Sequence, residues 1–133
     1  MPTRATARFK IAGWDEKTYT ELEDGGKLTQ ASVKQAFSGE IEGDGAVEWL
    51  MCYRPDATAE FVGLQHFVGR IGGRSGSFAL LQTAGSFDGA EARGKLSVVP
   101  GSGTQDLRGL RGNGEFSAPL GSEAAVTLDY DFE

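Results

Sequence analysis

Apolar and polar residues alternate along most of this chain with the two-residue period of β-strands. The clearest segment is 124–132, in which four apolar side chains alternate with polar ones. Residues 28–41 alternate in the same way, and a short run around Phe9 and Ile11 predicts a first strand that ends near residues 13–15. Each segment is predicted to be a strand with one buried face and one face in water.

Three runs in the middle of the chain have apolar residues in both phases: 47–53, 60–71 and 77–81. A strand that is apolar on both faces needs cover on both sides. In a small all-β protein one face can line a barrel interior while the other packs on a neighbouring subunit. The pattern therefore favours a homo-oligomer, either a dimer or a trimer.

Turn signals separate the runs at short, even spacing. They lie at residues 24–26, 43–45, 54–56, 72–73, 88–89 and 100–103. No segment of ten or more residues has a helical period, and only residues 104–111 favour a short helical turn. Regular strands with frequent turns predict an all-β fold, namely a closed antiparallel β-barrel of about eight strands that occupies residues 1–133 as one domain.

Glycines also fall inside the strand patterns, where they often mark bulges or sharp bends in a curling sheet. These positions are Gly39, Gly63, Gly69, Gly85 and Gly94. We therefore expect local irregularities of the sheet near them.

Composition and charge argue against two classes of partner, nucleic acids and membranes. The 13 Lys and Arg against 19 Asp and Glu give a net charge of −6, which argues against a nucleic-acid partner because such binding needs clustered positive charge. No run approaches the roughly 18 apolar residues that a membrane-spanning helix requires, and the N-terminus has no secretory signal. We expect a protein without membrane association, located in the cytoplasm.

Cys52 and His66 are the only cysteine and the only histidine. They exclude an intramolecular disulfide and argue against a structural zinc site, so no metal is expected. The glycine-rich residues 101–104 lack the Lys-Ser/Thr ending of a phosphate-binding loop, and no cofactor is expected either. Cys52 is predicted to be a small buried residue.

Five residues are predicted to supply the polarity of a ligand pocket: Glu40, Glu48, Tyr53, Gln65 and His66. A carboxyl group in an aromatic-lined cavity has a raised pKa and becomes a candidate acid or base. The alternative for Glu40 and Glu48 is the wet outer face of the sheet. His66 is either a general base or a histidine with a packing or surface role.

Several short motifs follow one another in a fixed order. They are Trp-Asp-Glu at 14–16, Gly-Leu-x-x-Phe-x-Gly at 63–69, Gly-Gly-Arg-Ser-Gly-Ser-Phe at 72–78, Val-Val-Pro-Gly-Ser-Gly-Thr at 98–104 and Leu-Asp-Tyr at 128–130. Over nearly the whole chain this set resembles a family of small bacterial proteins of unknown function. That family in turn is similar to the barrels of plant allene oxide cyclases and, more distantly, of dirigent proteins.

The resemblance implies a closed antiparallel barrel, often trimeric, with an apolar central cavity. It also implies chemistry without a cofactor, in which the cavity folds a flexible substrate and a carboxylate assists. Only Asp15 and Glu16 match that carboxylate by chain position, and no residue is transferred as catalytic.

Three functions follow from these observations. The first is a barrel that binds a small apolar molecule. The second is a cofactor-free cyclase or isomerase for a flexible apolar substrate, with a buried carboxylate or Tyr53 as its acid–base group. The third is a homo-oligomeric structural protein with an inert interior.

Overall fold

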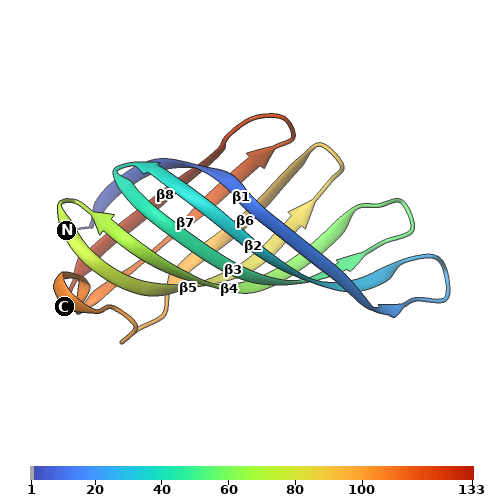
Figure 1. The fold of residues 1–133 in the computed structure, drawn as a ribbon, viewed down its shortest axis with the longest axis horizontal. Coiled ribbons are helices and arrows are strands. Elements are labelled where there is room, and N and C mark those ends of the chain that lie inside the picture. The colour runs from blue at the N-terminus through green and yellow to red at the C-terminus, as the bar shows by residue number, and fades with distance from the viewer. Residues whose placement is uncertain (1) are drawn as a thin grey trace.

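The chain folds into a closed antiparallel barrel of eight strands (Figure 1). The computed structural model describes residues 2–133. Each strand pairs with the next one along the chain, and β8 pairs back to β1, which confirms the predicted barrel. The elements are β1 (Thr3–Glu21), β2 (Lys27–Gly39), β3 (Ile41–Tyr53), β4 (Ala59–Ile71), β5 (Arg74–Phe87), β6 (Glu91–Val98), the 3₁₀ turn η1 (Gln105–Leu107), β7 (Leu110–Pro119) and β8 (Ala124–Phe132).

The alternating strands behave as their sequences predict. β8 covers the predicted segment 124–132, and its Val126 and Leu128 are buried in the barrel. In β2, Val33 and Phe37 point inward while Lys34 is exposed. Alternation thus assigns one face of each strand to the interior.

Two boundaries differ from the prediction. β1 does not end near residues 13–15 but continues to Glu21, because a bulge between Ile11 and Gly13 shifts its register with β2 and changes the phase of its alternation. Residues 43–45 are not a turn but part of β3. Gly43 has φ +150°, and a Cβ added to it would lie 2.7 Å from the Cα of Gly69, so two strand backbones approach closely there.

The connection between β6 and β7 seals the end of the barrel that holds both chain termini (Figure 1). The Oγ1 of Thr104 accepts the backbone N–H of Ser77 at 3.0 Å, and the Oγ of Ser102 accepts that of Ala79 at 3.0 Å. These bonds hold η1 against β5, where Leu107 is wholly buried. The predicted helical turn within residues 104–111 is confirmed as this short element.

Aromatic and aliphatic side chains fill the sealed half of the interior. Phe67 lies between Phe37 and Phe78, with ring centroids 5.4 and 5.1 Å apart. Ile71 and Leu110 complete the packing and are almost wholly buried. This half is therefore a solid core rather than a ligand space.

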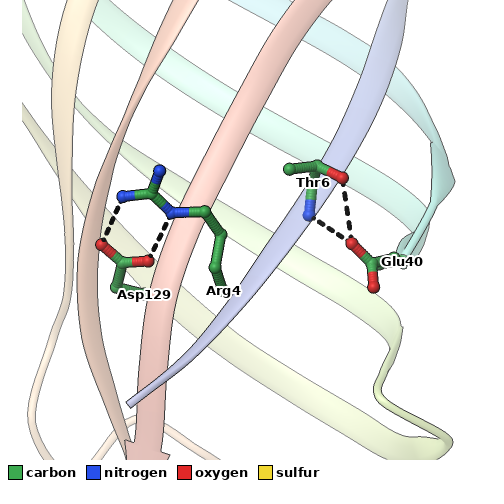
Figure 2. Close-up of polar contacts among 4 residues, drawn as sticks. All are labelled: Arg4, Thr6, Glu40 and Asp129. Carbon is green, nitrogen blue, oxygen red and sulfur yellow. Dashed lines mark hydrogen bonds and ion pairs between the residues drawn. The ribbon is translucent and has the colours of Figure 1, made fainter.

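Side chains on the outer surface reinforce the first strand on both sides, as Figure 2 shows. Arg4 donates to both carboxylate oxygens of Asp129 at 2.8 and 3.0 Å, and so joins β1 to β8. On the other side, Glu40 accepts the backbone N–H and the hydroxyl of Thr6 at 2.8 and 2.9 Å. The short turn between β2 and β3 is thereby fixed to β1.

We predict that the substitution Glu40→Gln lowers stability at neutral pH and has little effect in acid. The N–H of Thr6, and then its hydroxyl, lower the pKa of Glu40 because they donate to the charged carboxylate. A carboxyl whose folded-state pKa is lowered stabilises the protein above its unfolded-state pKa, and this contribution is lost as the pH falls through the folded-state value. Urea unfolding between pH 7 and pH 2.5 measures the difference between variant and wild type.

The matched control is Glu23→Gln, which lies exposed in the turn between β1 and β2. It is expected to keep the wild-type profile at all pH values. A difference between Glu40→Gln and wild type that stays constant from pH 7 to pH 2.5 would contradict the assignment.

Candidate ligand-binding cavity

The barrel contains a cavity of about 630 Å³ on the side away from the sealed end. The hairpins β1–β2, β3–β4, β5–β6 and β7–β8 lie at that end and diverge from one another (Figure 1). The volume is in the range of ligand sites, roughly 300–1,000 Å³. Most of the lining is aromatic or aliphatic: Phe9, Ile11, Trp14, Trp49, Met51, Tyr53, Phe61, Phe87, Ala92, Ala118, Pro119, Leu120 and Ala124.

Trp49 and Phe61 form the floor of the cavity, and Phe116 packs against both rings. Trp49 lies 5.2 Å from Phe61 and 6.4 Å from Phe116, measured between ring centroids. Glycines on neighbouring strands leave space for two of these rings. A Cβ added to Gly63 would lie 2.5 Å from Trp49, and one added to Gly85 would lie 2.4 Å from Phe61.

The sheet is also irregular at these two glycines. Pairing between β4 and β5 shifts at residues 61–63, and pairing between β5 and β6 shifts at residues 83–86. The predicted irregularities are confirmed at Gly63 and Gly85, and at Gly94, which lies opposite the second shift, whereas strand pairing is regular at Gly39 and Gly69. The missing side chains of Gly63 and Gly85 and the local bulges together bring the aromatic rings into the floor.

A chain of hydrogen bonds crosses the interior beneath the floor. The indole N–H of Trp49 donates to the Oε1 of Gln82, whose Nε2 donates to the Oε1 of Gln65 at 2.7 Å. The Nε2 of Gln65 donates in turn to the Oε1 of Gln35. All four side chains are buried and come from β3, β5, β4 and β2. Gln82 and Gln65 each accept one bond and donate the next, and Gln35 accepts the last, so this glutamine relay fixes the orientation of the floor.

Tyr53 is the one predicted residue that lines the cavity. Its hydroxyl lies 3.8 Å from the Sδ of Met51. Burial raises the pKa of Tyr53 to about 12, and the nearby carboxylate of Glu16 acts in the same direction. Tyr53 therefore remains a neutral hydrogen-bond donor over the physiological range.

Glu16 is the carboxylate next to this phenol. It accepts the indole N–H of Trp14 at 3.1 Å and the hydroxyl of Thr29 at 2.6 Å. These bonds hold Trp14 in the cavity wall and leave the charge of Glu16 facing Tyr53. Tyr53 thus brings a polar group to a largely apolar wall, with Glu16 beside it outside the lining; the other polar side chains of the lining are Lys10, Ser122 and Glu123.

The other predicted residues lie elsewhere. Gln65 is buried beneath the floor, in the relay. Glu40 is at the sealed end, while Glu48 and His66 are exposed on the outside of β3 and β4. Hydrogen bonds lower the pKa values of both carboxylates, with Ser32 the largest cause at Glu48. Neither is a carboxylic acid with a raised pKa in an aromatic cavity.

Sequence reasoning missed several residues near the cavity. Gln35 and Gln82 are polar residues in the inward phase of their strands, which was a visible signal for a buried network. At the mouth, Glu123 lies 3.9 Å from both Lys10 and Arg8. These charges could not be grouped from the sequence, because they come from β1 and from the turn before β8, which lie far apart along the chain.

Cys52 was predicted to be buried, and this was wrong. It is exposed because it occupies the outward phase of β3, between the inward residue Met51 and the cavity residue Tyr53.

The same range, residues 2–133, bears on metal binding and on membrane-spanning helices. No group of three or more His, Cys, Asp or Glu side chains in this range has the arrangement of a metal site. Within the same range, no helix has the length and apolar character needed to cross a membrane.

Fold and cavity together define a small closed β-barrel with a partly open interior. The model of a family described as "Protein of unknown function (DUF3224)" matches residues 5–130. The chain therefore belongs to the DUF3224 family, and the predicted resemblance to a family of unknown function is confirmed.

A solved structure supports the same assignment. It is the crystal structure of a DUF3224 protein of unknown function from Shewanella oneidensis MR-1, which is 28% identical to this chain. The match covers 100% of this chain and 99% of that one, with a TM-score of 0.84. A comparison with curated proteins gives no match.

We predict that Gln65→Leu destabilises the fold by about 2–4 kcal/mol, because it leaves an amide donor of Gln82 and an acceptor of Gln35 buried without partners. Urea unfolding measures this loss. Gln30→Leu is the control, since Gln30 is exposed and bonds only to Glu48 at the surface; its effect should stay within about 0.5 kcal/mol. Equal effects of the two substitutions would show that the relay does not stabilise the interior.

Proposed function

We propose that the protein binds a small apolar molecule in the cavity between the aromatic floor and the four diverging hairpins. The observation that carries the proposal is the division of the interior. One half is packed solid, whereas the other leaves about 630 Å³ lined by six aromatic rings. Protein interiors of this size are normally close-packed, so a space this large with an apolar wall fits a ligand.

The chemistry of the wall describes the ligand. Burial of apolar surface supplies most of the binding energy, at about 25 cal/mol per Å². Tyr53 and its neighbour Glu16 offer one polar contact on the wall, while Lys10 and Glu123 border the mouth. A compact, largely apolar molecule with one polar group matches this arrangement.

Both tryptophans of the protein, Trp14 and Trp49, lie in the cavity wall. Binding should therefore change the intrinsic fluorescence of the protein, and titration with N-phenyl-1-naphthylamine tests it directly. We expect saturable binding with one site per chain. A linear, non-saturating response would contradict the proposal.

The substitution Ala92→Phe should weaken probe binding by about tenfold or more, which corresponds to about 1.4 kcal/mol. Ala92 lines the cavity, so a phenyl group there occupies ligand space. The control is Ala125→Phe, an exposed position on the outside of β8. Equal affinities of both variants would place the probe outside the cavity.

A second candidate function is the cofactor-free isomerisation or cyclisation of a flexible apolar substrate. The pairing of Tyr53 with Glu16 favours it, because a neutral phenol beside a carboxylate can donate and recover a proton. The apolar walls would hold the substrate in a reactive conformation. The resemblance to allene oxide cyclase barrels belongs to this second candidate function.

If the cavity catalyses such a reaction, Tyr53→Phe and Glu16→Gln should each lower kcat by about 100-fold or more. Substrate Kd should change by less than about threefold, because the removed groups are small parts of the wall. Glu48→Gln is the control, since its carboxylate lies on the outer surface. Full turnover in the Tyr53 and Glu16 variants would exclude this pair from the chemistry.

A further inference from the structure

The outside of β4 is apolar along the middle of the strand. Val62, Leu64 and Val68 are each about half exposed, at 48, 56 and 52%. Leu50 of β3 lies opposite Val62, and Leu81 of β5 lies opposite Leu64, and both are also exposed. Aliphatic side chains from three adjacent strands thus form a patch in which the exposed His66 lies between Leu64 and Val68, and we call it the outer β4 face. A patch of this kind on a soluble barrel marks an interaction surface.

The charges at its two ends are of opposite sign. The outward residues of β4 run from Glu60 at one end to Arg70 at the other, with Leu64 and His66 in the centre. Glu60 pairs with Arg54, and Arg70 pairs with Glu42. If a second β4 strand is laid antiparallel on the first, Glu60 lies opposite Arg70 and Val62 lies opposite Val68. The outer β4 face is therefore complementary to itself.

We propose that two copies of the chain associate through the outer β4 face as a two-fold symmetric dimer, with the two β4 strands antiparallel. In this arrangement Glu60 of one copy faces Arg70 of the other, Val62 faces Val68, and Leu64 faces His66. A two-fold axis generates every contact twice. Each end then forms a row of four alternating charges, two from each copy.

The charge pattern selects this orientation over the parallel one. With the strands parallel, Glu60 would face Glu60 of the other copy and Arg70 would face Arg70. The two chains would then repel each other at both ends of the contact. The neighbouring part of β5 contributes uncharged outward residues, namely Ser77, Ala79 and Leu81, which extend the contact. Asp44 and Glu48 of β3 border the patch on the other side, where an interface rim is normally polar.

The first test is the oligomeric state of the full-length protein. Sedimentation velocity over 1–200 µM should show a monomer–dimer equilibrium or a stable dimer. Leu64→Lys should raise the dimer dissociation constant about tenfold or more, because two ammonium groups replace the leucines that face His66 and lose water at the centre of the contact. Ala125→Lys places the same group outside β8 and should keep the wild-type dimer. A monomer at all concentrations, or a trimer, would overturn the proposal.

The decisive test is a charge exchange. Glu60→Arg and Arg70→Glu should each weaken the dimer, because each creates two like-charge contacts. The double variant E60R/R70E should restore it to within about threefold of wild type. Residues 60 and 70 lie ten residues apart on one strand, roughly 33 Å, so they can compensate for each other only across two chains.

The double variant also separates association from folding. Within its own chain, each single variant replaces a surface ion pair by a like-charge pair, and the double variant contains both such pairs. Urea unfolding is therefore measured beside sedimentation for all three variants. Recovery of the dimer in E60R/R70E supports the antiparallel contact of the two β4 strands. A double variant weaker than either single one would overturn that contact, even if the protein is dimeric through another surface.

Discussion

The pairing of β8 with β1 is the constraint on which the rest of the structure depends. It closes the sheet, so every strand has a neighbour on both sides over at least part of its length, and the two faces of the sheet become an inside and an outside. Arg4 and Glu40 reinforce the first strand near the chain termini, where η1 also closes the interior. The opposite end carries only hairpins, and the space inside it follows from that asymmetry.

The glutamine relay and the aromatic floor contribute to the interior in different ways. Below the floor, the side chains of the glutamine relay bond to one another, and among residues 2–133 no buried side-chain nitrogen or oxygen lacks a partner. A ligand therefore meets the rings of Trp49 and Phe61 instead of competing for buried amides. The relay orients the ring of Trp49 through its indole N–H, while Gly63 leaves space beside that ring.

Much of the fold could be predicted because a period of two residues is a local signal. The alternation predicted the bounds of β8 and the closed barrel. It did not predict the second half of β1, because a bulge after Ile11 changes the phase of the alternation. The candidate site was harder. Alternation between the inward residues Val47 and Trp49 already places Glu48 outside, whereas the approach of Glu16 to Tyr53 depends on the register of three strands and cannot be read locally.

In β4 the odd-numbered residues 59–71 face the interior and the even-numbered residues 60–70 face solvent. Alternate residues of this one strand therefore form two surfaces, one inside the barrel and one outside it. A substitution at an odd position changes the packing around the cavity, and one at an even position changes what the outside of the barrel can touch. Selection can act on the two sets almost independently, so relatives of this chain could exchange one internal ligand for another while keeping their external contacts, or the reverse.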